Sequence, residues 1–336
     1  MDEAEQPGEA RFDSALGAWV LTSYADVSAA LRDPRLSVSG TSADGDAAHV
    51  AVREAAAHAL SPARLAAWRA EVEASARVLT ERLPAGVPVD LVGAFARPWS
   101  VTLAVRATGA PPADAERLDR LAREMFLAAA YATDSGFQPR AQAAVAKLAS
   151  SFPDAGASAD VQTYVALSQT LPCFLANGWL ELFRRSDEAD RLRAQPELMP
   201  KAVEELLRHA SPARAIFRRA LAEMSIGRAS VAPGDRVILM LSAANHDPAQ
   251  FPEPGRLDVR RDAAGHLAFG RGAHSCPGAP LIRMAVAVAT DALLSMTSAV
   301  EPVGEVEWIG GFAIRAPASL PVVLRREQLN RAPSTA

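Results

Sequence analysis

A glycine-rich stretch near the C-terminal end of the chain contains the residue best suited to chemistry, Cys276. Residues 269–278 read Phe-Gly-Arg-Gly-Ala-His-Ser-Cys-Pro-Gly, and the apolar segment that follows predicts a helix over residues 279–296. Glycine has no Cβ, so such a backbone can fold close against a flat ligand. A thiolate at the mouth of a helix is stabilised by the helix dipole and by the unpaired N–H groups there. The stretch therefore predicts a cysteine whose sulfur stays ionised and binds a metal, with a buried structural cysteine as the alternative.

The composition is that of a globular protein without a disulfide framework. Its 336 residues suffice for a large core, and 49% are hydrophobic and 22% charged. The net charge of −4 argues against nucleic acid as the main partner, and two cysteines fit a reducing cytoplasm. The first residues carry no targeting signal and the apolar runs are interrupted before they could span a bilayer, so we expect no membrane anchor. No linker is visible, so we expect a single domain over residues 1–336, with residues 1–12 disordered.

The elements that must position Cys276 are predicted to be mostly helical. Short strands are expected over residues 18–22 and 237–241, and a C-terminal hairpin over residues 308–312 and 319–324. Alanine content, periodicity and capping residues predict helices over residues 47–58, 61–83, 95–108, 115–132, 140–150, 161–185, 187–193 and 200–209. The long helix over residues 161–185 contains Pro172, which removes a backbone donor and should kink it.

The pattern Phe-Gly-x-Gly-x-His-x-Cys-x-Gly over residues 269–278 resembles the haem-binding loop of the cytochrome P-450 family. In that family a single Cys thiolate is the proximal ligand of the haem iron. The resemblance runs from about residue 18 to residue 325. It implies a mainly α fold with small β-sheets, the cytochrome P-450 fold. Here that fold is reduced at the N-terminus, in the B–C segment and in the F–I region.

The same resemblance implies how a haem b cofactor would be held. Cys276 would be the iron ligand, and basic side chains would hold the haem propionates because they suit carboxylates. His49 and Arg53 lie one helical turn apart; the alternative for them is an ordinary surface pair. The implied cofactor contacts are Cys276, His49, Arg53, Arg218, His274, Phe269, Gly270 and Gly278.

Other polar residues near these motifs receive structural roles. The resemblance implies a buried triad of Glu205, Arg208 and Arg256, because a buried ion pair is costly unless every partner is present. His246 and His266 are expected to be exposed loop residues. Arg214 could meet an acidic substrate, but we expect it to point to solvent, as alternate strand residues do.

The distal side departs from the family pattern. Residues 166–170 read Ala-Leu-Ser-Gln-Thr where the family has Ala-Gly-x-Glu/Asp-Thr, a segment that activates oxygen. Thr170 and Gln169 are therefore implied as catalytic residues, although Gln orients a water and does not shuttle a proton as a carboxylate does. We hypothesise that Pro172 opens the groove that glycine would permit and that residues 168–170 hold water there. The alternative is that Pro172 merely bends a packed helix.

The resemblance implies a bacterial-type cytoplasmic haem-thiolate monooxygenase that acts on a small organic substrate of specialised metabolism. Its electrons would come from a ferredoxin or a flavoprotein, and the cofactor would carry the chemistry. The altered distal side leaves two alternatives. One is a peroxide-using or redox-neutral catalyst of cyclisation, rearrangement or dehydration. The other is a non-catalytic haem-binding protein that docks a partner enzyme or a carrier protein at the shortened distal face.

Overall fold

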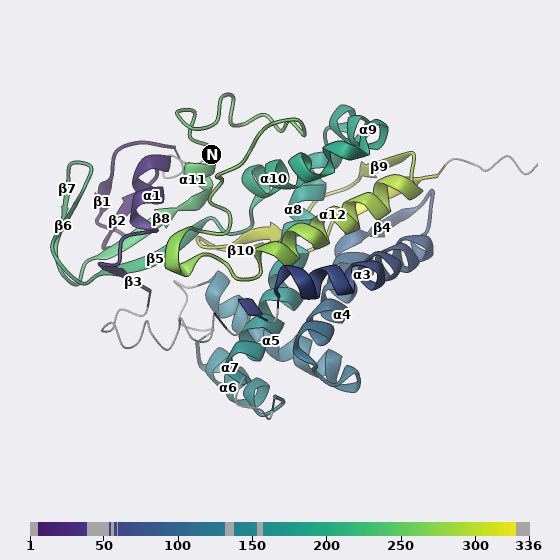
Figure 1. The fold of residues 1–336 in the computed structure, drawn as a ribbon, viewed down its shortest axis with the longest axis horizontal. Helices are drawn as coiled ribbons and strands as arrows, with labels where there is room; N and C mark the ends of the chain where they lie inside the picture. Colours follow the sequence, from purple (N-terminus) through teal and green to yellow (C-terminus); the bar gives the residue numbers. More distant parts are fainter. Residues whose placement is uncertain are drawn as a thin grey trace, which may run out of the picture.

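Helices make up most of the molecule, and the largest sheet lies at one end of it (Figure 1). The computed structural model describes residues 6–38, 54, 57–58, 60–131, 138–152 and 157–326. Its helices are α1 (Tyr24–Ala30), α3 (Pro62–Arg82), α4 (Arg97–Thr108), α5 (Ala115–Ala130), α6 (Gln138–Ala149), α7 (Ala157–Val165), α8 (Leu171–Phe183), α9 (Ser186–Ala194), α10 (Met199–Ala210), α11 (Leu241–Asn245) and α12 (Ala279–Met296). Two π-helical turns, Val92–Ala96 and Ala166–Thr170, precede α4 and α8.

The strands form four small sheets. The largest has the order β1-β2-β8-β5-β3, with β2 and β8 parallel and the other pairs antiparallel. The others pair β4-β12-β9, β6-β7 and β10-β11. The strands are β1 (Arg11–Asp13), β2 (Ala18–Leu21), β3 (Leu36–Ser37), β4 (Pro88–Asp90), β5 (Ala215–Ala220), β6 (Met224–Ile226), β7 (Ala229–Val231), β8 (Arg236–Met240), β9 (Ala299–Pro302), β10 (Trp308–Gly310), β11 (Arg315–Pro317) and β12 (Pro321–Arg325).

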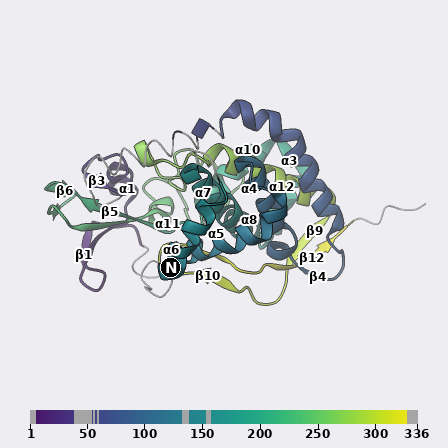
Figure 2. The same ribbon diagram turned by 90° about the horizontal axis from the view of Figure 1, so that it is seen from below.

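Both faces of the largest sheet are covered. Val237 and Leu239 pack with α1 on one face, whereas Ile238 and Met240 pack with Ala18 and Val20 on the other. Side chains alternate between faces along a strand, so a run of apolar residues is what a strand buried on both sides requires. Figure 2 shows this sheet set apart from the helical body.

The central helix α8 is apolar all round, which is typical of a helix inside a protein. Twelve of its thirteen residues are buried, and the remaining one, Glu181, is half-buried. The Trp179 indole N–H donates to the Thr290 hydroxyl (3.1 Å), which joins α8 to α12. The expected helix over residues 279–296 is confirmed as α12.

Helix α12 corrects the expectation that every apolar run is too short to span a bilayer. Its 18 residues have a mean hydropathy of 1.4, enough by length and composition to cross a membrane, but 67% of them are buried inside the protein. The helix packs against α3, α8 and α10. A core helix meets the same criteria as a membrane span, so the burial accounts for this composition.

Two other expectations are wrong. Arg11 and Phe12 belong to β1, which pairs with β2, so part of the segment expected to be disordered is a strand. The expected C-terminal hairpin between residues 308–312 and 319–324 does not form. Trp308 pairs with Pro317 across β10 and β11, whereas β12 joins β4 and β9.

Candidate functional site

The Cys276 loop is a compact turn that closes on itself just before α12. The Cys276 N–H donates to the Phe269 carbonyl (2.8 Å). Gly270 and Gly272 adopt φ of +65° and +75°, a region that side-chain-bearing residues rarely visit. Gly278 caps α12, and a Cβ there would lie 3.7 Å from the Cys276 sulfur. The sequence therefore folds into a loop that presents a half-buried thiol at the mouth of a helix.

The loop is anchored on two sides of the molecule. A Cβ on Gly272 would lie only 2.9 Å from the Leu31 carbonyl oxygen, so this glycine lets the loop pack against the end of α1. The Phe269 ring lies 5.6 Å from the Phe174 ring on α8. The second contact ties the Cys276 loop to the central helix.

The carboxylate of Glu204 on α10 bonds to residues on both sides of the Cys276 loop in the sequence, His266 before it and Arg283 after it. Glu204 accepts two hydrogen bonds from Arg283 on α12 (2.5 and 2.9 Å) and lies 3.1 Å from His266 Nε2. Burial raises the pKa of Glu204, but the hydrogen bonds from His266 and Arg283 outweigh it and lower the pKa to about 2. The Arg283 guanidinium stacks 4.8 Å from the Phe269 ring centre. The expectation that His266 is exposed is wrong, since the residue is only 7% exposed.

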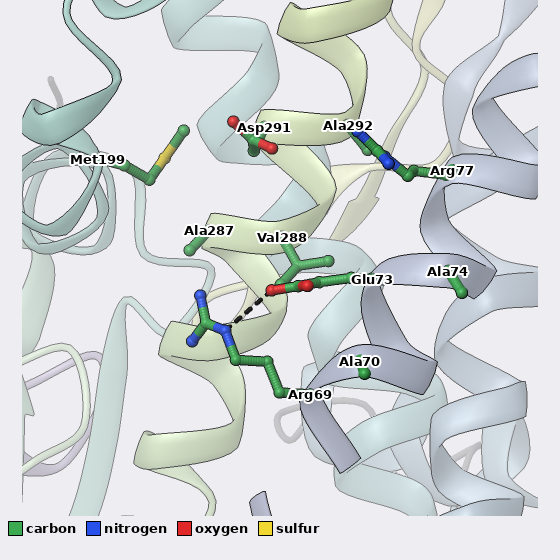
Figure 3. Close-up of a pocket in the computed structure, with 10 residues that line it drawn as sticks. All are labelled: Arg69, Ala70, Glu73, Ala74, Arg77, Met199, Ala287, Val288, Asp291 and Ala292. Atoms are coloured by element: carbon green, nitrogen blue, oxygen red, sulfur yellow. Dashed lines mark hydrogen bonds and ion pairs between the residues drawn. The ribbon is translucent and has the colours of Figure 1, made fainter. Parts of the chain in front are cut away.

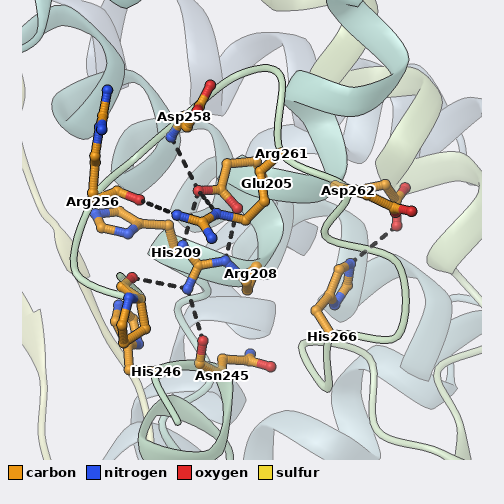
Figure 4. A network of polar contacts seen from close by, with 12 residues as sticks. Glu205, Arg208, His209, Asn245, His246, Arg256, Asp258, Arg261, Asp262 and His266 are labelled. Carbon is orange, nitrogen blue, oxygen red and sulfur yellow. Dashed lines mark hydrogen bonds and ion pairs between the residues drawn. The ribbon is translucent and has the colours of Figure 1, made fainter. Parts of the chain in front are cut away.

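Glu205 is fully buried and lies at the centre of a polar network, shown in Figure 4. Its carboxylate accepts hydrogen bonds from Arg208 Nε (2.7 Å) and Nη2 (2.9 Å) and from the Asp258 N–H (3.1 Å). The second cation is Arg261, whose Nε lies 3.0 Å from Glu205 Oε1. Arg256 instead points away and pairs with Glu253 at 3.7 Å, on an exposed turn. The Glu205–Arg208 pair is thus present, but the expected role of Arg256 belongs to Arg261.

His246 is also placed differently from the expectation of an exposed loop residue. It is half-buried, its Nδ1 lies 2.9 Å from the Ser242 carbonyl, and its ring is 5.3 Å from the His209 ring. Burial is the main cause that lowers the pKa of His246 to about 4, helped by the charges of His209 and Arg208. His246 and His266 are covered because α10 packs against the segment that follows α11. The residues next to each histidine in the sequence do not reveal this packing.

The expected interruption of the long helix is a π-helical turn, Ala166–Thr170, between α7 and α8. The Leu171 N–H donates to the Ala166 carbonyl, five residues earlier, and Pro172 stands in the first turn of α8. Proline has no N–H to continue the α-helical ladder, and π turns often occur where a ligand meets a helix. Thr170 is half-buried, and Gln169 is buried against α5.

The basic residues expected at the propionates are only partly described. Arg218 on β5 is 8% exposed and donates to the Phe217 carbonyl (2.8 Å), and His274 ends the short turn Gly272–His274 in the Cys276 loop. His49 and Arg53 lie outside the described residues. Arg214 lines an open groove of about 360 Å³ beside Trp308 and Arg315.

A groove of about 570 Å³ lies between α3 and α12 (Figure 3), and the residues that line it do not include those of the Cys276 loop. Small residues such as Ala74 and Ala287 line it, and Arg69 pairs with Glu73 (2.8 Å) at its edge. Its part of α12 begins more than two turns after the start of that helix. The groove is therefore separate from the Cys276 loop at the start of that helix.

The residues around Cys276 fit a flat, metal-centred cofactor. A glycine-lined loop presents one thiol, and Phe269 packs between α8 and the Arg283 guanidinium. In the described part of the chain, no three His, Cys, Asp or Glu side chains gather into a group that could hold a metal ion, so a metal here would take its protein ligand from Cys276.

Comparison with known proteins identifies the family. A family model described as cytochrome P450 matches residues 184–301. The mycinamicin IV hydroxylase/epoxidase of Micromonospora griseorubida is 31% identical over 373 residues, covering 96% of this chain and 94% of that protein. The alignment is longer than the 336 residues of the chain, so it contains gaps where this chain is shorter.

Solved structures agree. P450BioI in complex with an acyl carrier protein that carries hexadec-9Z-enoic acid has a TM-score of 0.84 and 23% identity, with 92% of each chain covered. The tirandamycin C-bound P450 monooxygenase TamI has a TM-score of 0.80 and 29% identity, covering 92% of this chain and 90% of that one. The fold is therefore the mainly helical cytochrome P450 fold, and the chain belongs to the cytochrome P450 family as a monooxygenase-type oxidoreductase.

Proposed function

We propose that this chain binds haem b through the Cys276 thiolate and hydroxylates or otherwise oxygenates a small organic molecule. Membership of the family implies a haem-thiolate cofactor. The observation that carries the proposal is the half-buried Cys276 on a glycine-lined loop at the mouth of α12. When bound, the haem supplies the oxygen chemistry, and the protein supplies position and protons.

Residues that the structure describes would line both faces of the haem, the proximal face at Cys276 and the distal face at the π-helical turn. Phe269, Gly270 and Gly278 would shape the proximal side around the sulfur, while Arg218 and His274 would meet the propionates. His49 and Arg53 complete that set by resemblance. On the distal side, the π-helical turn would bring Thr170 and Gln169 to the reacting centre. We treat the chain as one domain, since α8 and α12 share a single core with most of the other helices.

The substrate class follows from the relatives. One relative is named for oxidising mycinamicin IV, and one solved structure holds tirandamycin C. We therefore propose a specialised metabolite as substrate, a ferredoxin or flavoprotein as electron donor, and the cytoplasm as location. A carrier protein is a further candidate partner, because P450BioI was solved with one.

A peroxide-using or redox-neutral reaction is the second candidate. It is favoured by the residues of the π-helical turn, where Gln169 and Leu167 replace the acid and glycine of the family pattern. A glutamine does not exchange a proton at neutral pH, so a reaction that needs no proton delivery would suit this helix.

The experiment is a substrate-binding screen followed by turnover. Candidate metabolites are first screened by the spectral shift that they cause in the holoenzyme. The best binder is then turned over with a ferredoxin–reductase system, with peroxide alone, or with no oxidant or reductant. Product that requires the reductase system supports the monooxygenase. Product with peroxide alone, or without any redox partner, supports the second candidate.

A further inference from the structure

We propose that Asp119 on α5 supplies the carboxylate that the π-helical turn lacks, and that Gln169 connects it to the reacting side of the helix. This inference rests on the proposed function. Its starting point is that Ala166–Thr170 contains no ionisable side chain. A carboxylate that contacts this turn comes from another helix, α5.

The contact between the two residues is short and partly buried. Gln169 is 5% exposed, and its Nε2 donates to Asp119 Oδ1 at 2.5 Å. The same nitrogen lies 3.2 Å from the Ser168 hydroxyl, which is also buried. The Gln169 amide therefore links a carboxylate on α5 to a hydroxyl inside the π-helical turn.

Asp119 is held in place and still reaches solvent. Arg97 on α4 pairs with its other oxygen, Nη2 to Oδ2, at 2.8 Å. The Asp119 side chain is 19% exposed and that of Arg97 is 31% exposed. A carboxylate in this position can exchange protons with water outside while it remains bonded to a residue inside.

A small void lies beside Gln169 and Arg97, the two partners of Asp119; Asp119 itself is not among the residues that line it. It measures about 20 Å³, enough for about one water molecule. Ser168, Gln169 and Pro172 line it on the helix, and Arg97 and Arg123 face them from α4 and α5. Pro172 has no N–H, so it cannot donate the hydrogen bond that the carbonyl four residues earlier would accept in a regular α-helix.

The proposed reaction consumes protons, and these must reach the reacting side of the helix. Oxygenation of a substrate RH by O₂, with two electrons and two protons, gives ROH and one water. The electrons come from the donor protein, so the protons must enter separately. We assign their entry to the Asp119 carboxylate, then to water that connects it with the void beside Arg97, and then to the Ser168 hydroxyl, which lines the void, with Thr170 as the last hydroxyl of the turn. Gln169 keeps its own protons and positions the carboxylate.

The test compares holoenzymes that differ at these two positions. Asp119→Asn removes the acid and Gln169→Met removes only the hydrogen bond. The swap of Asp119→Asn with Gln169→Glu moves the carboxylate onto the helix. Asp114→Asn is the matched control, because Asp114 pairs with Arg117 (3.3 Å) at the N-terminal end of the same helix and its side chain is 43% exposed. Oxygen consumption is measured with a ferredoxin–reductase system and the best binder from the spectral-shift screen, and the urea midpoint is measured for each variant.

The expected result separates proton supply from packing. Asp119→Asn and Gln169→Met should slow oxygen consumption about ten-fold or more, and the swap should restore it. The swap should also recover the urea midpoint that the single changes lower, which shows that the two side chains are in contact. Unchanged oxygen consumption in both single variants would overturn the inference. A wild-type protein that takes up no haem would instead overturn the proposed function.

Discussion

The Phe269 ring lies 5.6 Å from the Phe174 ring, and this contact joins the Cys276 loop to the central helix. Phe269 also meets the Arg283 guanidinium of α12, which lies 4.8 Å from its ring centre. One aromatic residue thus contacts both the central helix α8 and α12, the helix that follows the Cys276 loop. Rigid placement of a ligand by packed neighbours is what a metal-binding loop requires.

Gly272 should be the glycine of the Cys276 loop whose replacement by alanine destabilises the protein most. Gly272→Ala combines a φ of +75° with a Cβ 2.9 Å from the Leu31 carbonyl. We expect a loss of about 1–3 kcal/mol in the free energy of unfolding, measured with urea. Gly304→Ala is the control, since Gly304 has a φ of +67° but nothing within 4 Å. It should cost only about 1 kcal/mol. Equal losses would show that the contact with α1 does not constrain the loop.

The Glu205 network predicts how much stability the protein loses when each of three arginines is replaced. Arg208→Leu strands a buried carboxylate and should cost about 3–5 kcal/mol in urea unfolding. Arg261→Ala leaves Glu205 its other donors and should cost about 1–2 kcal/mol. Arg256→Ala should stay within about 0.5 kcal/mol, because this side chain is 58% exposed. A loss at Arg256 as large as that at Arg261 would contradict the assignment.

His246 should make stability depend on pH. Its pKa falls from 6.5 to about 4 in the folded protein, so the unfolded chain takes up this proton first as the pH falls. The stabilising contribution is therefore complete above pH 6.5 and is lost as the pH falls toward about 4, by on the order of 2 kcal/mol.

The His246 contribution can be separated from that of the carboxylates. Glu204 and Glu181 have pKa values of about 2, lowered from 4.5, so their contributions are lost only at lower pH. His246→Leu should flatten the stability profile between pH 6.5 and 4.5, measured by urea unfolding at each pH. The exposed His58 serves as control, and His58→Leu should leave the slope unchanged. A slope that survives in His246→Leu would exclude this histidine as its cause.

Much of the fold could be predicted because its signals are local. Helix α12 has the predicted limits, and the Glu205–Arg208 pair follows from helical spacing. The Cys276 loop was evident because glycine, histidine, cysteine and proline fall in a short, fixed order. In each case a few neighbouring residues determine the outcome.

The errors concern partners that are distant in sequence. Arg256 and Arg261 are both arginines near the same turn, and only the packing of that turn on α10 selects Arg261. His246 and His266 have loop-like sequence neighbours but are covered by α10 and its surroundings. The contact of Gln169 with Asp119 joins residues 50 positions apart, and no periodic pattern marks it.

The most direct test of the central claim is the carbon monoxide difference spectrum of the reduced protein. The wild-type chain should take up haem and show a thiolate-type band. Cys276→Ser should lose that band, whereas Cys173→Ser should keep it, since Cys173 is buried and its sulfur contacts the Gln169 carbonyl. A thiolate-type band that persists in Cys276→Ser would contradict the assignment of Cys276 as the iron ligand.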